Sequence, residues 1–343
     1  MCHGGLAPVF SLQPTPIANA FQEEPDTGEK YPLELMQCAV CRHVQLRHTF
    51  EGLFEGYKYS TPQESAPYLQ AAARTLVERY QPNNCVEIGS NNGLYTDILH
   101  DSGIHTVIGV DPAGTHWASW KCNFDLRTAE KIKDRVGLID LVVCNNVCAH
   151  VDDLDGIFVG IDHLLADNGA VIIEVQDFGE MVNAGIFDTI YHEHVDQHTP
   201  GPWRAFLRRF NLKLSRVEQT PVHGGSLRIT ATRKREVEWS DRPIDWDVYA
   251  RKVVAVQERV KAAEPRVAWG AAAKLTTMVH QCDLSLDYVV DYTPAKQGLY
   301  LPGTGTRIMP DFSGVDSPVL LGAWNYAKIF AEKYDYEAIN PYT

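Results

Sequence analysis

The chain has 343 residues, of which 45% are hydrophobic and 22% are charged, and its formal net charge at pH 7 is −13. This composition is ordinary for a soluble protein of two or three domains, and the acidic balance argues against nucleic acid as a partner, because binding a phosphate backbone requires clusters of Lys and Arg. No run of 18 apolar residues and no signal-peptide pattern is found, so we expect a cytoplasmic protein with no membrane span.

The first 60 residues carry five prolines and no long hydrophobic period, which predicts a small appended domain of short strands and turns. The run Cys38-Ala39-Val40-Cys41 has the spacing of half a zinc ribbon, and Cys2 is the other cysteine upstream. His3 could supply a fourth ligand. The sequence therefore allows a structural zinc held by Cys2, Cys38 and Cys41, or a hairpin that buries its thiols.

A helix is predicted from Ser65 to Tyr80, because its apolar residues recur at three- and four-residue spacing. The segment Asn84–Gly93 follows and organises the chain. It is a buried strand that breaks into a glycine turn and opens a second helix.

The glycine turn has the form Glu87-x-Gly89-x-x-x-Gly93, with a carboxylate where a dinucleotide fingerprint has its first glycine. A carboxylate favours a cationic ligand over a pyrophosphate. This form looks like the first motif of class I methyltransferases that bind S-adenosylmethionine, and the alternative is an ordinary strand-to-helix turn. The expected cofactor contacts in this turn are Glu87, Gly89, Ser90, Asn91 and Gly93.

Two more apolar strands are predicted, at His105–Val110 and Ile139–Cys144. The first ends in Asp111, at the position where an acidic residue accepts hydrogen bonds from ribose hydroxyls. The alternative role of Asp111 is to cap the helix after Pro112. Asn145 and Asn146 follow the second strand, where a ligand in the same crevice would lie, and they complete this set of expected cofactor contacts.

Later segments extend the α/β pattern. A helix is predicted at 153–165, a strand at 170–175, and an antiparallel pair within 211–233. A second strand, glycine turn and helix begin at 266–274, with further strands at 287–291 and 319–324. Lys274 at the start of that helix could meet a phosphate, or it could be a solvated lysine.

The run Tyr191-His192-Glu193-His194 is the strongest cluster of chemically active side chains. Methyl transfer to carbon needs a base that removes a proton next to a carbonyl group, and an imidazole titrates near the working pH. His194 fits that role. Metal binding by the H-x-H pair and a polar surface turn are the alternatives; a metalloprotease would need H-E-x-x-H on a helix.

Taken together, these motifs resemble the sugar C-methyltransferases of deoxysugar pathways, which act on nucleotide-linked keto sugars. The resemblance covers most of the chain and rests on matches that keep the family's order: L-x-P-T-P-I-A-N-A-F at 12–21, C-x-x-C at 38–41, Y-x-Y at 57–59, E-I-G-S-N-N-G at 87–93, N-N-V-C-A-H-V at 145–151, Y-H-E-H at 191–194, H-G-G-S-L-R at 223–228, G-A-A-A-K at 270–274 and D-Y-T-P-A-K-Q at 291–297.

The resemblance implies an α/β protein with three domains: a small zinc-ribbon-like domain at 1–60, a class I adenosylmethionine-binding Rossmann-like domain at 61–234, and a second Rossmann-like domain at 235–343 that helps to bind the substrate. S-adenosylmethionine is the implied cofactor and a nucleotide-activated keto sugar the implied small-molecule partner. His194 is the implied base, beside Tyr191 and Glu193, and His223 or Tyr191 would stabilise the enolate. The remaining implied contacts are Tyr59 to the cofactor, and His192, Gly224, Lys274 and Lys296 to the substrate.

The chain departs from the family pattern in several places. One cysteine of the zinc site would precede Met1, the aromatic residue expected soon after Tyr191–His194 is replaced by Val195-Asp196-Gln197-His198, and the third domain is shorter than usual. We therefore expect a trimmed C-terminal domain. An O- or N-methyltransferase acting on another small acceptor, and a non-catalytic protein that binds sugar nucleotides, are the alternative functions.

Overall fold

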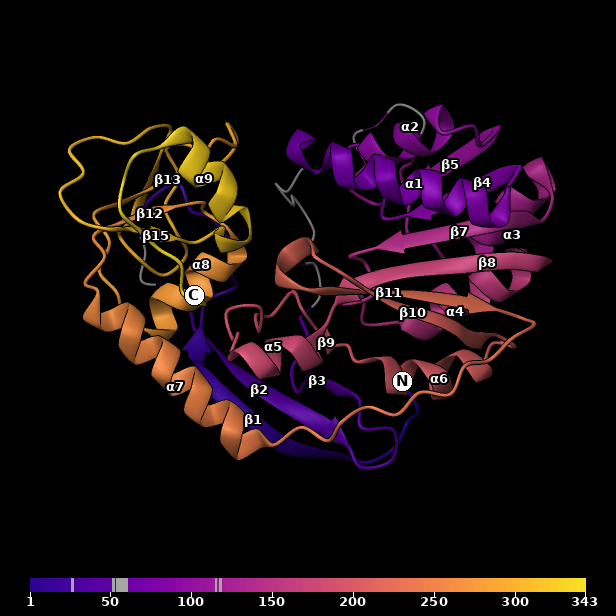
Figure 1. Cartoon of the computed structure of the whole chain (residues 1–343), viewed down its shortest axis with the longest axis horizontal. Coiled ribbons are helices and arrows are strands. Elements are labelled where there is room, and N and C mark those ends of the chain that lie inside the picture. Colours follow the sequence, from indigo (N-terminus) through magenta and orange to yellow (C-terminus); the bar gives the residue numbers. More distant parts are fainter. Residues whose placement is uncertain (26–27, 51–52, 54–60, 115, 117–118) are drawn as a thin grey trace.

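The structure is a computed structural model that describes residues 1–25, 28–50, 53, 61–114, 116 and 119–343. Three sheets organise the described residues: a seven-stranded sheet, a five-stranded sheet, and a four-stranded sheet that runs beneath both (Figure 1). This is the α/β architecture that the sequence predicts.

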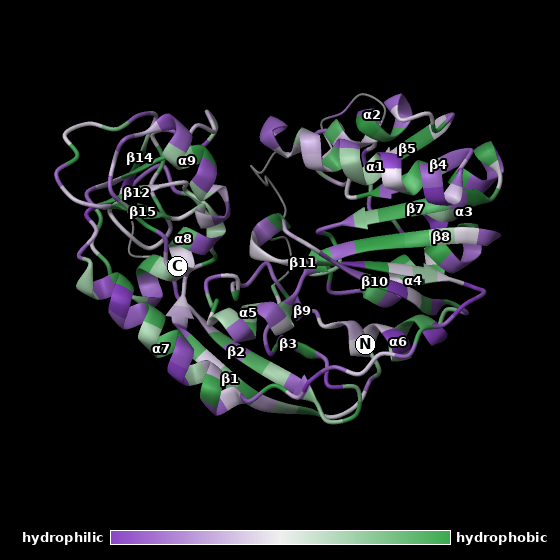
Figure 2. Cartoon of the chain, in the orientation of Figure 1, coloured by the Kyte–Doolittle hydropathy of each residue, from purple (hydrophilic) through white to green (hydrophobic). Residues whose placement is uncertain are grey.

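The seven-stranded sheet has the order β10-β11-β8-β7-β4-β5-β6. Its strands β4 to β8 are parallel, and β11 and β10 add an antiparallel pair at one edge, as predicted. The central strands are apolar along much of their length (Figure 2), because both faces of the sheet are covered. The strands are β4 (Asn84–Ile88), β5 (Thr106–Val110), β6 (Ser119–Trp120), β7 (Ile139–Asn145), β8 (Leu165–Gln176), β10 (Lys213–Thr220) and β11 (Ser226–Thr232).

Helices cover this sheet on two faces. The apolar sides of α1 (Ala66–Tyr80) and α2 (Leu94–Asp101) pack on one face, and those of α3 (Leu126–Val136), α4 (Leu154–Leu164) and α6 (Pro200–Arg208) pack on the other. The helices predicted at 65–80 and 153–165 are therefore confirmed to within one residue at each end. The strand predicted at 170–175 is part of β8, which begins earlier than expected, at Leu165.

The N-terminal sheet has the order β1-β2-β3-β9. The expectation of short strands is wrong for β1 (Leu6–Thr15) and β2 (Tyr31–Cys38), which have ten and eight residues. Pro8 and Pro14 are tolerated because β1 is the edge strand of this sheet. Beyond β3 (Val44–Leu46), the fourth strand is β9 (Asp196–Gln197), which comes from the segment directly after His194.

The five-stranded sheet is parallel, with the order β14-β13-β12-β15-β16. It confirms the predicted second α/β unit. Its strands are β12 (Val267–Trp269), β13 (Tyr288–Val290), β14 (Arg307–Met309), β15 (Val319–Leu321) and β16 (Ala338–Ile339), and its helices are α8 (Ala273–Gln281) and α9 (Ala327–Lys333), with the single turn η3 (Trp324–Tyr326) before α9.

The N-terminal and C-terminal sheets share one hydrophobic core. Buried residues of β1 to β3, of the C-terminal strands, of α5 (Phe178–Ala184) and of α7 (Trp246–Ala262) belong to a single contiguous cluster. Ile186, Phe187 and Ile190 also lie in this cluster, immediately before Tyr191. Among the described residues, no helix has both the length and the hydrophobicity that a bilayer crossing requires.

Candidate functional site

The glycine turn after β4 depends on the absence of side chains at two positions. Gly89 has φ of 78°, and a Cβ there would lie 2.2 Å from Cγ2 of Val147. Gly93 has φ of 77°, and a Cβ there would lie 2.1 Å from the His116 ring. Both positions therefore require glycine for conformation and for space, and the turn packs closely under the loop after β7.

Asp111 at the end of β5 braces the same turn. Its Oδ2 accepts a hydrogen bond from the backbone N–H of Asn91 at 2.9 Å, and its Oδ1 accepts one from that of Ala113 at 2.8 Å. The carboxylate thus lies against the turn at the carboxyl edge of the sheet, where a ribose would lie, and each oxygen retains capacity for a further donor.

Glu87 is a buried carboxyl group at the head of the turn. Its Oε2 accepts a hydrogen bond from the neutral hydroxyl of Thr96. Burial, together with the nearby carboxylates of Asp111 and Asp97, raises the pKa of Glu87 to about 8. A ligand with positive charge beside this group would recover the cost of ionising it.

The other expected cofactor residues lie around the same edge. The hydroxyl of Ser90 is 2.8 Å from that of Ser119, so it faces the β5–β6 side. Asn145 ends β7, and Asn146 has φ of 54° and donates its backbone N–H to the carbonyl of Glu174 at 2.7 Å. Tyr59 lies outside the described residues.

Tyr191 and His194 form a buried hydrogen-bonded pair. The Tyr191 hydroxyl lies 2.7 Å from Nε2 of His194, and Nδ1 of His194 lies 2.9 Å from the carbonyl oxygen of Thr189. A carbonyl oxygen can only accept, so Nδ1 carries the ring proton. Nε2 of the neutral imidazole therefore accepts the hydrogen bond of Tyr191.

His150 lies on the other side of His194. The two imidazole centroids are 4.5 Å apart, while the Tyr191 ring stacks on His194 at 4.1 Å. Burial, followed by the proximity of His150, Lys274 and His223, holds the pKa of His194 well below its usual value. We assigned His150 no role from the sequence, although its place after the predicted strand 139–144 was an available signal.

Glu193 and His192 point away from this pair. Oε1 of Glu193 accepts hydrogen bonds from the backbone and side-chain N–H groups of Asn19, at 2.9 and 3.0 Å. Burial raises the pKa of Glu193. His192 packs edge-on against Tyr31 and Phe50, and burial lowers its pKa. The two side chains therefore contact the N-terminal domain.

The same domain also holds the end of the segment 191–197. Nε2 of His43 is 2.5 Å from Oδ1 of Asp196, and β3 pairs with β9 through Val44 and Gln197. Burial alone would raise the pKa of Asp196, but His43 holds it below its usual value. Residues 191–197 are thus fixed by contacts that are remote in sequence.

A third contribution comes from the C-terminal domain through Trp324. Its Nε1 donates to Oδ2 of Asp188 at 2.7 Å, and its ring lies against Gly224, where a Cβ would come within 2.1 Å of it. Burial raises the pKa of Asp188 to about 6. No sequence pattern pointed to Asp188 or Trp324, because each acts through a contact between distant segments.

His223 and Lys274 bring further basic groups to this junction. His223 is half-buried in the turn η2 (Val222–Gly224), and burial, followed by the charge of Lys274, lowers its pKa to about 4. Lys274 is 8% exposed; its Nζ donates to Oδ1 of Asn325 at 3.1 Å and lies 4.3 Å from the Trp324 ring centre. Burial lowers its pKa to about 8.

Lys296 stabilises the second glycine turn, at residues 270–272, through its contacts with Ala271 and Asp291. Its Nζ donates to the carbonyl of Ala271 at 2.8 Å and lies 3.8 Å from Asp291, while the Phe21 ring covers it at 5.1 Å. Asp291 accepts the N–H of Ala271 at 2.8 Å, which repeats the bond between Asp111 and Asn91 in the first unit. The sequence prediction placed Lys296 at the substrate; in the structure its contacts are with the turn itself.

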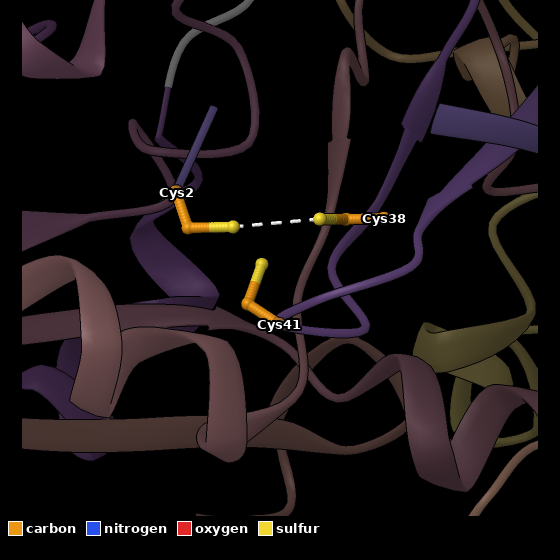
Figure 3. A group of neighbouring side chains, drawn as sticks. All are labelled: Cys2, Cys38 and Cys41. Carbon is orange, nitrogen blue, oxygen red and sulfur yellow. Dashed lines mark hydrogen bonds between the residues drawn. The ribbon is translucent and has the colours of Figure 1, made fainter. Parts of the chain in front are cut away.

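Three thiols gather in the N-terminal domain. The sulfur atoms of Cys2, Cys38 and Cys41 point toward one another (Figure 3) and lie within 4.8 Å of one another. Burial alone would raise the pKa of Cys38, but N–H groups of Cys41 and Val40 lower it to about 7.

His3, which the sequence offered as a fourth ligand, contacts Arg209 and Asp155, so it does not complete the group of thiols. Soft thiolate donors fit zinc, and no fourth ligand joins them among the described residues.

Three family models match the chain in order. They are described as a putative zinc binding domain at residues 1–52, a methyltransferase domain at 63–217, and a C-methyltransferase C-terminal domain at 245–339. The C-methyltransferase NovU from Streptomyces niveus is 28% identical over 373 aligned residues, which cover 95% of this chain and 89% of NovU.

Two solved structures each resemble about half of the chain. An O-methyltransferase family protein from Burkholderia thailandensis is 15% identical over 50% of this chain and 56% of its own, with a TM-score of 0.36. The 1,6-didemethyltoxoflavin-N1-methyltransferase of the same organism, solved with S-adenosylhomocysteine, is 15% identical over 56% of this chain and 96% of its own, also with a TM-score of 0.36. These likenesses are too weak to carry an assignment.

The three matched domains fall in the same order as the N-terminal thiol group, the glycine turn of the seven-stranded sheet and the second α/β unit, and the alignment with NovU runs through all of them. The chain is therefore an S-adenosylmethionine-dependent C-methyltransferase that carries the three domains of these family models in their order.

Proposed function

We propose that this enzyme methylates the carbon next to the ketone of a nucleotide-activated keto sugar. The observation that carries the proposal is the buried cluster of basic groups where the C-terminal domain meets the carboxyl edge of the seven-stranded sheet. His150, His194 and Tyr191 come from the methyltransferase side, and Lys274 comes from the C-terminal side. A site that must form and hold an enolate needs a neutral base and a nearby positive charge.

The cofactor would lie on the turn at Glu87–Gly93, with its sulfonium and ammonium charges toward the acidic groups there and its ribose at Asp111. The base at His194 and Tyr191 would remove the α-proton, and the electron pair of the C–H bond would enter the enolate. The enolate carbon would then attack the methyl group while the C–S bond breaks toward sulfur. Lys274 and His223, which lie near His194, would stabilise the enolate oxygen.

The nucleotide part of the substrate would bind at the second glycine turn. Lys274 follows that turn in the first turn of α8, where backbone N–H groups and a lysine together favour an anion such as a diphosphate. The proposed substrate contacts on this side are Lys274 and Gly224, with Lys296 bracing the turn.

The predicted division into domains at 1–60, 61–234 and 235–343 forms part of this proposal, with β9 crossing from the second domain into the sheet of the first. Cys2, Cys38 and Cys41 would hold zinc in a structural role, in which it would tie the segment before β1 to the β2–β3 hairpin.

The test is transfer of a ¹³C-labelled methyl group from S-adenosylmethionine to a panel of nucleotide-linked 4-keto sugars. We expect a new carbon–methyl bond in the product, observed as a ¹³C methyl signal coupled to the ring carbon beside the ketone. The matched control is the same sugar nucleotide with a 4-hydroxyl group, which cannot form an enolate and should not react. Methylation on oxygen or nitrogen, or no turnover on any keto sugar, would contradict the proposal.

A further inference from the structure

The proposed function leaves open which atom takes the α-proton, and the inference drawn here rests on that function. We propose that the hydroxyl oxygen of Tyr191 accepts the proton from the acceptor carbon and, in the same step, passes its own proton to Nε2 of His194. Tyr191 is then the catalytic residue that contacts the substrate, and His194 is the final proton acceptor behind it.

The first argument is that both nitrogens of His194 are engaged. Nδ1–H is bound to the carbonyl of Thr189, and Nε2 receives the Tyr191 hydroxyl at 2.7 Å. The ring also lies between those of Tyr191 and His150, at 4.1 and 4.5 Å. A substrate C–H group could reach Nε2 directly only if the Tyr191 bond were broken and its ring displaced.

The second argument is the place of Tyr191. Its side chain packs with Ala18 of the N-terminal domain and with Ala273, the first residue of α8 after the second glycine turn, so it lies where all three domains meet. Ala273 directly precedes Lys274. A sugar linked to a nucleotide at that turn would therefore come first to Tyr191, and the His194 ring stacks on the Tyr191 ring.

The third argument concerns charge. The buried ammonium of Lys274 lies close enough to disfavour a positive charge on His194. The same ammonium favours negative charge on an oxygen. Transfer through the phenol, like direct transfer, creates the enolate and the imidazolium together, so the charge balance permits the relay, and the contacts of His194 and Tyr191 favour it over direct transfer.

The step balances without any co-reactant. The C–H bond breaks, its electron pair enters the enolate, a new O–H bond forms on Tyr191, and the original phenol proton moves to His194. After the methyl group has been transferred, His194 releases its proton to solvent. The two residues then return to their starting hydrogen bond.

The experiment follows exchange of the α-proton with deuterated solvent, with S-adenosylhomocysteine in place of the methyl donor. We expect Tyr191→Phe to slow exchange by about 100-fold or more, as much as His194→Asn does, since either change removes the relay. Tyr288→Phe is the matched control. Its hydroxyl donates to the carbonyl of Ser313 at 2.7 Å in the C-terminal domain, and its loss should leave exchange unchanged.

If His194 acted directly, Tyr191→Phe would free Nε2 and exchange would continue near the wild-type rate, which would overturn the inference while the proposed function stands. A wild-type enzyme that exchanged no α-proton in any keto sugar would overturn both. A second measurement needs no variant: the ¹⁵N resonances of His194 in the wild-type enzyme should show a protonated Nδ1 and a bare Nε2. A protonated Nε2 in the resting enzyme would also overturn the relay.

Discussion

Binding of the cofactor should change the protonation state of the buried carboxyl group of Glu87. Its pKa is raised to about 8, so most of it is protonated at pH 7 in the cofactor-free enzyme. A cationic ligand favours the carboxylate, so binding should release a proton. We expect affinity for S-adenosylmethionine to rise up to about tenfold per pH unit between roughly pH 6 and 8, and to level off above that range.

Calorimetry in two buffers with different heats of ionisation measures the released proton, and Glu87→Gln should abolish it. The raised pKa also makes the cofactor-free protein lose stability as the pH rises from 4.5 toward about 8, because the folded state disfavours the charged form. Affinity that does not change with pH would show that the cofactor charge lies elsewhere.

His194 offers the second test at this scale. His194→Asn should lower turnover by about 10²- to 10⁴-fold, the usual contribution of a positioned general base. Its affinity for S-adenosylmethionine should stay unchanged, because His194 hydrogen-bonds Tyr191 and Thr189 and not the glycine turn. Glu193→Gln is the comparison: its side chain contacts Asn19, so the loss should be smaller. Near wild-type turnover of His194→Asn, with inactive His150 or His223 variants, would move the base to another residue.

At the scale of elements, the sequence predicts best those helices and strands whose buried residues recur at regular spacing. The strands β4, β5 and β7 are short apolar runs between turn residues, and α1 and α4 repeat their apolar residues at helical spacing, so periodicity alone locates them. The strand β9 has two residues and no period of its own. Its pairing with β3 is set by the N-terminal domain, which no local pattern reveals.

The cluster of three thiols at Cys2, Cys38 and Cys41 leads to a prediction about bound zinc and about the stability of the N-terminal sheet. Enzyme purified without chelator should contain about one equivalent of zinc, as a thiolate-rich site predicts, and Cys38→Ser should lose it. Because Cys38 ends β2, which pairs with β3 and through it with β9, the variant should also lose thermal stability and turnover. Cys122→Ser is the control, since that thiol lies by Thr128 in the methyltransferase domain. Less than about a tenth of an equivalent in the wild type would exclude zinc as the bound metal.

At the scale of the whole molecule, the candidate site is formed by segments from all three domains. Ala18, His150, Tyr191, Gly224 and Lys274 come from five separate segments, and each was placed on its own element by sequence patterns or by resemblance. Their meeting depends on the shared core and on Trp324, which are properties of the folded chain. This is why the sequence could suggest a base and a cofactor turn but could not show that Glu193 and His192 contact the N-terminal domain.

A substitution at Gly224 tests whether its contact with Trp324 is needed to assemble the candidate site. Gly224→Ala would place a Cβ 2.1 Å from the Trp324 ring at φ of 84°, so Trp324 must move and the C-terminal domain must shift. We expect KM for the sugar nucleotide to rise about tenfold or more, from roughly 1.4 kcal/mol of lost binding, while affinity for S-adenosylmethionine is kept. Steady-state kinetics and calorimetry separate the two quantities.

Gly298→Ala is the matched control, because Gly298 has φ of 85° and a Cβ there would meet no atom within 4 Å. It carries the same backbone strain without the clash. Equal effects of the two variants on KM would show that strain, and not the contact with Trp324, is responsible.

The two-residue strand β9 also limits how this enzyme can be recombined. A chimera that takes its first 60 residues from a relative would receive a foreign β3, yet it would keep Asp196 and Gln197, which pair with the original one. The segments that must be exchanged together are therefore not contiguous in the sequence: the N-terminal sheet and residues 186–198 must come from the same parent protein. Any library that shuffles these modules at their boundaries in the sequence would break the register at the strand that follows His194.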